Sequence, residues 1–248
     1  MTMTGDKLST SWWSSRLERE VAVARWGTFG TPVLVFPTAG GDAEEIERFH
    51  LVDAVGELLG AGRVKLYSCD SVNGRVLLAG EGDARHRTRM LIQFLEYIRC
   101  EVVPAIRSDC QSADIEIVVA GSSIGAYNAL AVLCRSPETF RAAVCMSGTY
   151  DLARFLDGPT DDDFVAASPL RFLPGLDEDG ALLQRLRTRF VVLATGQGAH
   201  EDAGESWRAA HELGSRGVPN RVDLWGPEWP HDWQTWRAML PYYLDSLC

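Results

Sequence analysis

The chain has 248 residues and a formal net charge of −10 at pH 7, and 46% of its residues are hydrophobic. This composition is typical of a globular protein with a sizeable buried core, and it excludes a disordered chain. The negative charge argues against a nucleic-acid partner, because binding a phosphate backbone requires a basic surface. No repeat or linker marks a domain boundary, so we expect one domain spanning residues 1–248.

The N-terminal stretch MTMTGDKLST lacks the basic flank and the apolar segment of a signal peptide. No apolar run approaches the 18 or so residues of a membrane span. We therefore expect a cytoplasmic protein that does not associate with membranes. The six cysteines show no CxxC spacing and interrupt apolar segments, which favours reduced core thiols. The sequence leaves open whether the chain forms a homo-oligomer.

Short apolar runs alternate with segments of helical periodicity, which predicts an α/β fold with a mainly parallel sheet and helices on both faces. Residues 18–26 and 33–36, separated by a turn at Gly27 and Gly30, predict an antiparallel hairpin that enters the sheet. The other predicted strands are 64–67, 115–120, 142–146, 190–194 and 222–225. In such a sheet the active site lies beyond the carboxyl ends of the strands, so catalytic residues are expected in the loops that follow them.

Three helices are indicated by apolar residues that recur every three or four positions. The first covers 91–106, and Pro104 is expected to kink or end it. The second follows residue 125, and the last covers 233–247. The stretch between residues 147 and 190 is modest in length, which predicts little or no lid over the site.

The predicted strand 115–120 is followed by Gly121, Ser122, Ser123, Ile124 and Gly125, which fit the G-x-S-x-G pattern. A helical segment begins at once, as the nucleophile elbow of a serine hydrolase requires, and the two glycines would let strand and helix approach each other. The alternative is an ordinary turn in which Ser122 or Ser123 caps the helix. Since Ser122 is out of register for the elbow, we predict that Ser123 is the nucleophile.

A serine nucleophile needs an imidazole to accept its proton. In folds with this elbow the histidine follows the last strand, and His231 lies there, between the loop 226–230 and the last helix. A role in capping that helix is the structural alternative. His200, in another loop after a strand, is the weaker candidate.

The acid of the triad is expected after the penultimate strand, where Glu201 and Asp202 are adjacent. We favour Glu201, but the choice stays open, because Asp202 could instead cap the helix that carries Trp207. Asp151 is a more distant candidate that also suits capping a turn.

An oxyanion hole needs two backbone N–H groups, one of them from the residue after the nucleophile, here Ile124. The other is expected from the loop 38–41, where Gly40 and Gly41 would let the backbone approach a ligand. We regard Thr38, Gly40 and Trp229 as candidate residues of the substrate pocket. No metal-ligand cluster or phosphate-binding glycine loop is evident, so neither a metal nor a cofactor is expected.

With these motifs the chain resembles the esterase D-like branch (putative esterases) of the α/β-hydrolase superfamily, which includes S-formylglutathione hydrolases, feruloyl esterases and mycolyltransferases. The resemblance runs from about Val21 to Leu244. Its most specific parts are the elbow, the loop of Ala39, Gly40 and Gly41, and His231 followed by Asp232, Trp233 and Trp236. In feruloyl esterases of this branch the acid lies about thirty residues before the histidine, which implies Glu201. The resemblance also implies Ala39 as the second oxyanion donor.

Taken together, the sequence predicts an α/β-hydrolase fold and a serine carboxylesterase that hydrolyses a small or medium acyl ester. The predicted triad is Ser123, His231 and Glu201. An acyltransferase of the same fold is the first alternative, and a binding protein that retains the fold without activity is the second.

Overall fold

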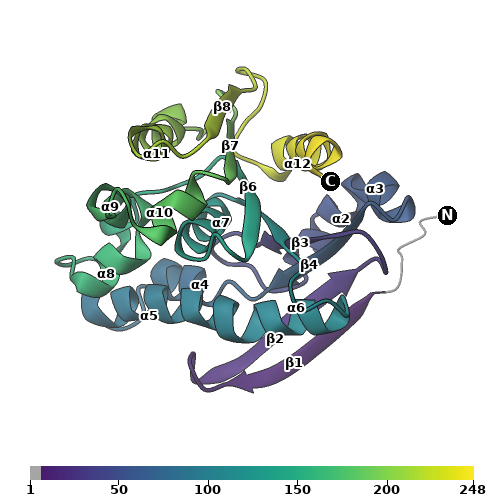
Figure 1. Cartoon of the computed structure of the whole chain (residues 1–248), viewed down its shortest axis with the longest axis horizontal. Helices are drawn as coiled ribbons and strands as arrows, with labels where there is room; N and C mark the ends of the chain where they lie inside the picture. The colour runs from purple at the N-terminus through teal and green to yellow at the C-terminus, as the bar shows by residue number, and fades with distance from the viewer. Residues whose placement is uncertain (1–6) are drawn as a thin grey trace.

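The computed structural model describes residues 7–248. The six residues before them, which belong to the stretch in which no signal peptide is predicted, lie outside the described part. The described residues form one eight-stranded sheet in the order β1-β2-β4-β3-β5-β6-β7-β8 (Figure 1). Strands β3 to β8 are mutually parallel, whereas β1 and β2 pair antiparallel. The strands are β1 (Leu8–Ser14), β2 (Arg19–Trp26), β3 (Thr31–Phe36), β4 (Val64–Cys69), β5 (Ile117–Ser122), β6 (Phe140–Met146), β7 (Phe190–Thr195) and β8 (Asn220–Leu224).

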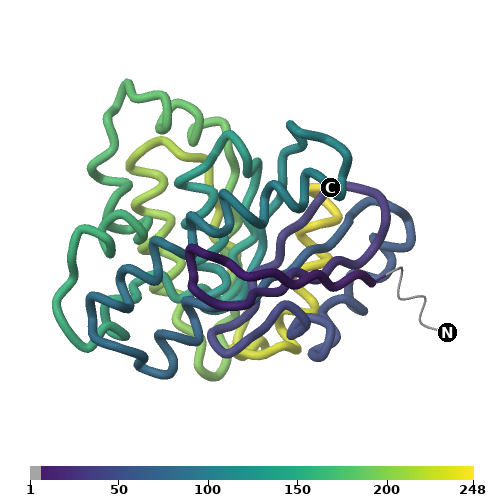
Figure 2. The backbone as a smooth tube through the Cα atoms, turned by 90° about the horizontal axis from the view of Figure 1, so that it is seen from below, coloured from purple at the N-terminus to yellow at the C-terminus, as the bar shows by residue number. Residues whose placement is uncertain are grey.

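The N-terminal hairpin is not the one that the sequence pattern predicts. We expected 18–26 to pair with 33–36, but β2 pairs with β1 and β4, and β3 lies between β4 and β5. Strand β1 was not predicted because most of its residues are exposed, so it lacks the buried apolar positions that mark the other strands. The hairpin of β1 and β2 forms one edge of the sheet, at the bottom of Figure 1 and nearest the viewer in Figure 2.

Helices cover both faces of the sheet, as predicted. Since successive side chains of a strand point to opposite faces, Leu34 and Phe36 join one core cluster and Val33 and Val35 the other. The larger cluster includes residues of α4 (Val72–Ala79), α5 (Ala84–Tyr97), α6 (Val103–Asp109), α7 (Ile124–Arg135), α8 (Asp162–Ala167), α10 (Ala181–Leu186) and α11 (Ala203–Ser215). The smaller one includes residues of α1 (Glu45–Arg48), α2 (Leu51–Ala54), α3 (Gly56–Gly60) and α12 (Trp233–Leu247).

The helix does not end at Pro104. Helix α5 passes directly into a π-helical turn, η1 (Ile98–Val102), and then into α6, and the residues at both junctions keep helical φ and ψ angles. The irregularity lies in the turn just before the proline, whose missing N–H interrupts the hydrogen-bond ladder there.

Between β6 and β7 the chain forms short helices on one flank. They are η2 (Ala153–Phe155), α8, α9 (Pro169–Phe172), η3 (Leu173–Gly175) and α10. Of these, α8 packs against α5, α9 against α7 and α11, and α10 against α7, on the left of Figure 1. Within residues 7–248, no helix combines the length and the apolar character that crossing a membrane would need.

Candidate active site

Ser123 occupies a strained turn between β5 and α7. Its φ and ψ angles are 58° and −121°, a region that residues with a side chain rarely adopt. The turn is held by the Ser123 N–H, which donates to the Met146 carbonyl at 3.0 Å on the neighbouring strand, and by the Ser123 carbonyl, which accepts from the Ala126 N–H at 3.1 Å. Ser122 is the buried last residue of β5. Ser123 is therefore the serine presented at the carboxyl end of the strand.

Both glycines of the elbow are required by close packing. A Cβ atom on Gly121 would clash with the backbone of Gly125, and one on Gly125 would clash with the carbonyl oxygens of Phe36 and Pro37. The start of α7 is thus pressed against both its own strand and the end of β3. This packing brings Ser123 and the loop after β3 to the same point of the sheet.

The loop after β3, residues 38–41, is called the oxyanion loop below. A buried carboxylate fastens it: the Thr38 N–H donates to Glu45 Oε2 at 2.7 Å, and the Thr38 hydroxyl donates to Glu45 Oε1 at 2.8 Å. Both hydrogen-bond donors of Thr38, its N–H and its hydroxyl, are therefore directed to Glu45. Burial raises the pKa of Glu45, although the hydrogen bonds from Thr38 oppose this.

Candidates for both backbone N–H groups of an oxyanion hole remain free in the described residues. Ile124 is the first residue of α7, so its N–H has no acceptor within the helix. In the oxyanion loop, Gly41 donates to the Thr38 carbonyl at 3.1 Å, whereas Ala39 and Gly40 donate no hydrogen bond within the described residues. This pattern favours Ala39 or Gly40, rather than Thr38, as the second donor.

Glu201 and His231 lie together at the ends of β7 and β8. Glu201 Oε2 is 3.6 Å from His231 Nδ1, an ion-pair distance slightly longer than a hydrogen bond. The Glu201 side chain is only 1% exposed, and it accepts hydrogen bonds from the hydroxyls of Ser147 at 2.5 Å and Thr195 at 3.1 Å. Burial opposes ionisation, but His231 and these hydroxyls outweigh it and lower the pKa of Glu201. Glu201 is therefore held as a carboxylate.

The two other acids that the sequence left open have different surroundings. The Asp202 side chain is 63% exposed and caps α11 by accepting the Gly204 N–H at 2.9 Å. Asp151 accepts the Ala153 N–H at 3.1 Å in a turn and lies 3.5 Å from Arg171. Both positions match the structural alternatives considered for them.

The loops that carry Glu201 and His231 are joined by their backbones. In the acid loop, residues 196–202, Gln197 and Gly198 donate to carbonyls of the histidine loop, residues 225–232, at 2.9 and 3.0 Å. The His231 N–H donates in return to the Ala199 carbonyl at 2.9 Å. A Cβ on Gly196 would clash with the Trp229 carbonyl, so this approach requires glycine. The hydrogen bonds of the described residues do not include one between Ser123 and His231.

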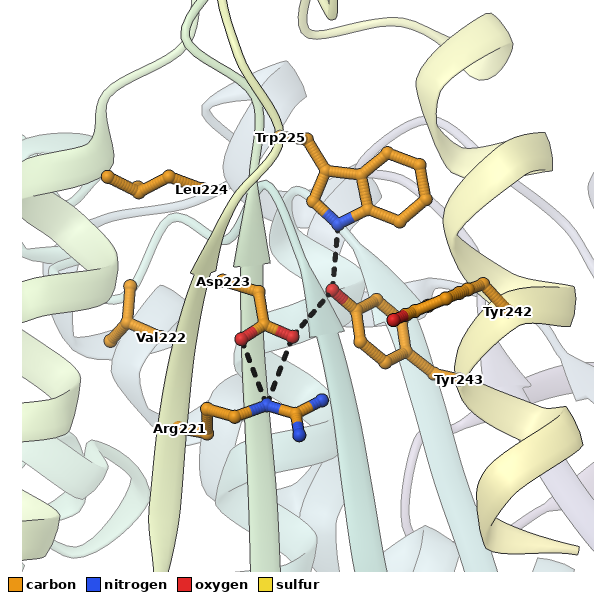
Figure 3. A pocket seen from close by; sticks show the side chains of 7 residues that line it. All are labelled: Arg221, Val222, Asp223, Leu224, Trp225, Tyr242 and Tyr243. Atoms are coloured by element: carbon orange, nitrogen blue, oxygen red, sulfur yellow. Dashed lines mark hydrogen bonds and ion pairs between the residues drawn. The ribbon is translucent and has the colours of Figure 1, made fainter.

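A cavity of about 510 Å³ lies between β8 and α12, where Trp225 begins the histidine loop (Figure 3). Its polar groups satisfy one another: Tyr243 accepts the Trp225 indole N–H at 2.7 Å and donates to Asp223 at 2.9 Å, and Arg221 pairs with the same carboxylate. Trp229, predicted as a pocket residue, packs edge-on against Trp225 at 5.2 Å between ring centroids. We interpret this cluster as a brace that holds the histidine loop against α12.

Sequence reasoning missed two residues of this neighbourhood, Ser147 and Glu45. Ser147 directly follows β6, so the strand-end rule that led to Ser123 could have found it. Nothing in the sequence separates Glu45 from Glu44 and Glu47. Within the part of the chain that the structure describes, no group of three or more metal-ligating side chains comes together.

Comparison with known proteins places the chain among esterases. The sequence model of the putative esterase family matches residues 62–245, and no curated protein sequence matches the chain significantly. A solved ferulic acid esterase is 16% identical with a TM-score of 0.74, covering 98% of this chain and 97% of its own. An S-formylglutathione hydrolase from Agrobacterium tumefaciens is 12% identical with a TM-score of 0.72, covering 99% and 95%.

A third structure, the fluorophosphonate-binding serine hydrolase F of Staphylococcus aureus, is 13% identical with a TM-score of 0.68 and covers 98% of both chains. At these identities the likenesses show the fold alone. They confirm the expected α/β-hydrolase fold with its mostly parallel sheet.

Proposed function

Because the chain belongs to the putative esterase family and thus acts on carboxylic esters, we propose that it is a serine carboxylesterase that uses Ser123, His231 and Glu201. The observation that carries the proposal is the conformation of Ser123. A serine with a φ of 58° at the tip of a glycine-enclosed strand–helix turn is costly to the fold. The Glu201–His231 pair supports it, since the two residues lie in the loops after β7 and β8 of the same sheet.

In the proposed mechanism, His231 accepts the Ser123 proton as the hydroxyl attacks the ester carbonyl. The N–H groups of Ile124 and Ala39 stabilise the resulting oxyanion. His231 then protonates the departing alcohol, which leaves an acyl group on Ser123. Water, deprotonated by His231, attacks this acyl group, and His231 returns the proton to the Ser123 oxygen as the carboxylic acid leaves. Glu201 stabilises the imidazolium in both steps.

The mechanism requires the second ring nitrogen of His231 to reach the Ser123 hydroxyl when substrate is bound. Hydrogen bonds of this kind are often long in ligand-free enzymes and shorten in the complex. The Glu201 carboxylate supports this arrangement, because an acceptor at Nδ1 leaves the other nitrogen free to accept a proton.

The proposed substrates are small or medium acyl esters. The helices between β6 and β7 support this, since they pack against α5, α7 and α11 on the flank of the sheet. This placement agrees with the expectation of little or no lid, and an open site favours short acyl groups over long lipids. We expect kcat/KM for p-nitrophenyl esters to fall as the acyl chain grows from acetate to decanoate. An optimum at the longest chain would contradict the proposed size range. Adding an alcohol acceptor tests acyl transfer, which would appear as ester exchange that exceeds hydrolysis.

The main test is the Ser123→Ala variant with p-nitrophenyl acetate and a fluorophosphonate probe. Wild-type protein should hydrolyse the ester and bind one probe covalently. Ser123→Ala should lose the label, and kcat should fall by about 10⁴-fold or more. The matched control is Ser122→Ala, one residue earlier, which should still label. Folded wild-type protein that neither labels nor turns over would refute the proposal.

The acid is tested by comparing Glu201→Gln with Asp202→Asn. If Glu201 holds the imidazolium, Glu201→Gln lowers kcat by about 10³- to 10⁴-fold, the loss expected when the acid of a triad becomes an amide. Asp202→Asn should retain activity because its side chain is exposed and caps α11. The opposite result would assign the role to Asp202.

A further inference from the structure

We propose that Ser147 is a positioning residue that orients the Glu201 carboxylate, and that Trp236 fixes the direction of the Ser147 hydroxyl. The inference rests on the proposed function, because it concerns the acid of the same site. It gives a role to Ser147, which the motifs do not include, and to Trp236, which the resemblance includes without a role. Because Ser147 is buried, its hydroxyl contacts the Glu201 carboxylate but is not exposed to substrate.

The direction of each hydrogen bond follows from the chemistry of the donors. The Trp236 indole N–H can only donate, and it lies 3.0 Å from Ser147 Oγ. Ser147 Oγ therefore accepts from Trp236. Its own proton is left to donate to Glu201 Oε1, 2.5 Å away. The chain of contacts from Trp236 through Ser147 to Glu201 thus has a single direction.

The two oxygens of Glu201 have separate partners. Oε1 accepts from Ser147, while Oε2 faces His231 Nδ1 at 3.6 Å and the Thr195 hydroxyl at 3.1 Å. The Thr195 proton is less committed, because the Gly196 carbonyl is also within reach at 3.2 Å. Ser147 is therefore the donor that fixes the carboxylate, with one oxygen held and the other turned toward the imidazole.

The backbone of Ser147 shows that the position is tightly determined. Its φ angle is 47°, in the left-handed region where a non-glycine residue is strained. A hydrogen bond stabilises this strained conformation, because the Ser147 N–H donates to the Ala194 carbonyl on β7 at 2.7 Å. This conformation places Ser147 Oγ between α12 and the acid loop, so a strained serine follows β6 as well as β5.

Trp236 connects this support to the base. Its ring packs edge-on against the His231 imidazole, with 5.2 Å between ring centroids and an interplanar angle of 86°. Trp236 is itself buried on α12. The Trp236 side chain thus contacts His231 directly and Glu201 through Ser147. A single residue of α12 therefore aligns both the acid and the base.

The test begins with Ser147→Ala and Ser147→Gly, with kcat and KM measured on p-nitrophenyl acetate. Both variants remove the hydroxyl, and the glycine variant also relieves the positive φ, so it should fold where alanine is poorly tolerated. We expect kcat to fall about 10- to 100-fold, with KM within about two-fold of wild type. Ser168→Ala is the matched control, since Ser168 is a buried serine whose hydroxyl has no partner in the described residues.

A double-mutant cycle separates positioning from a general structural effect. In a Glu201→Ala background, Ser147→Ala should change kcat by less than about two-fold, because its effect acts through Glu201. Trp236→Phe, which keeps a ring but removes the N–H, should lower kcat less than Ser147→Ala does. A full additional loss in the Glu201→Ala background would overturn the proposal, as would a kcat of Ser147→Gly equal to that of wild type.

Fluorophosphonate labelling distinguishes the two levels of failure. Ser147→Gly retains Ser123 and should label completely, only more slowly than wild type. If wild type labels and Ser147→Gly labels at the same rate, the positioning role fails while the proposed function stands. If wild type itself does not label, the proposed function fails first.

Discussion

The two sides of the candidate site are fastened by different means. The oxyanion loop is held by side-chain chemistry, because Thr38 directs its N–H and its hydroxyl to the buried Glu45 carboxylate. The acid and histidine loops are held by backbone hydrogen bonds that glycine permits. The position of the oxyanion loop therefore depends on the charge of Glu45, which can titrate. The junction of the acid and histidine loops depends instead on glycines, which have no side chain. The two sides should respond differently to substitution and to pH.

Among the substitutions that test this comparison of the two sides, Gly196→Ala is expected to have the largest effect. The added methyl group would clash with the Trp229 carbonyl and push the acid and histidine loops apart. We expect kcat to fall by about 10²-fold, the loss that a displacement of about 1 Å can cause. The free energy of unfolding should fall by about 1–3 kcal/mol from overpacking. Steady-state kinetics and urea unfolding measure the two effects.

The control for this substitution is Gly60→Ala in α3. A Cβ at Gly60 meets no atom within 4 Å, so the same change should leave kcat unaltered and should not destabilise the protein. Wild-type kcat in Gly196→Ala would show that the backbone junction does not position the pair.

A smaller effect is expected from Glu45→Gln. Glutamine keeps the size of the side chain but offers one acceptor oxygen, so one Thr38 donor would face an amide N–H₂ group. We expect a loss of about 1–3 kcal/mol in the free energy of unfolding. The kcat should fall about 10-fold, less than when an oxyanion donor is removed outright. Glu44→Gln, at the partly exposed neighbouring position, should match wild type. An unchanged kcat in Glu45→Gln would show that the Glu45 carboxylate does not position the oxyanion loop.

The smallest effect is a difference in how pH changes stability. Burial raises the folded-state pKa of Glu45 above its ordinary 4.5, so the folded state binds this proton more tightly than the unfolded state does. Wild type should therefore lose stability relative to Glu45→Gln as pH rises above 4.5, through the folded-state pKa of Glu45. The folded-state pKa of Glu201 is lowered, so the opposite holds there. Wild type should lose stability relative to Glu201→Gln as pH falls below 4.5.

Urea unfolding of the three proteins between about pH 3 and pH 7 measures both trends. If wild type and Glu45→Gln showed the same pH dependence of the free energy of unfolding, the oxyanion loop would not depend on the charge of Glu45.

Much of the fold was predictable because its strands are buried on both faces. The parallel strands β4 to β7 read as continuous apolar runs, and each was found with its ends off by a few residues. Strand β1 was not found, because its alternation is hidden by exposed serines and tryptophans. The partner of β2 was wrong because pairing depends on which strand comes alongside after folding, which local periodicity does not encode.

The candidate site was predictable where a residue follows a recognisable strand or motif. Ser123, His231 and Glu201 were selected on that basis, and the structure brings the last two together. The supports were not predictable for a physical reason. The role of Glu45 arises from its burial beside Thr38, and Ser147 depends on an indole 89 residues further along the chain. Contacts of this kind appear only after the chain has folded.

The positive φ angles of Ser123 and Ser147 have a consequence for engineering. Glycine adopts this region freely, whereas other residues give up about 1–2 kcal/mol there. At Ser147 the gain is offset, because glycine would leave the Glu201 carboxylate and the Trp236 indole N–H without their hydroxyl partner. The Ser123 hydroxyl makes no hydrogen bond within the described residues, so a screen that rewarded heat resistance alone would favour glycine there. That gain would remove the hydroxyl that the proposed chemistry needs, so the more robust protein would be an inactive one.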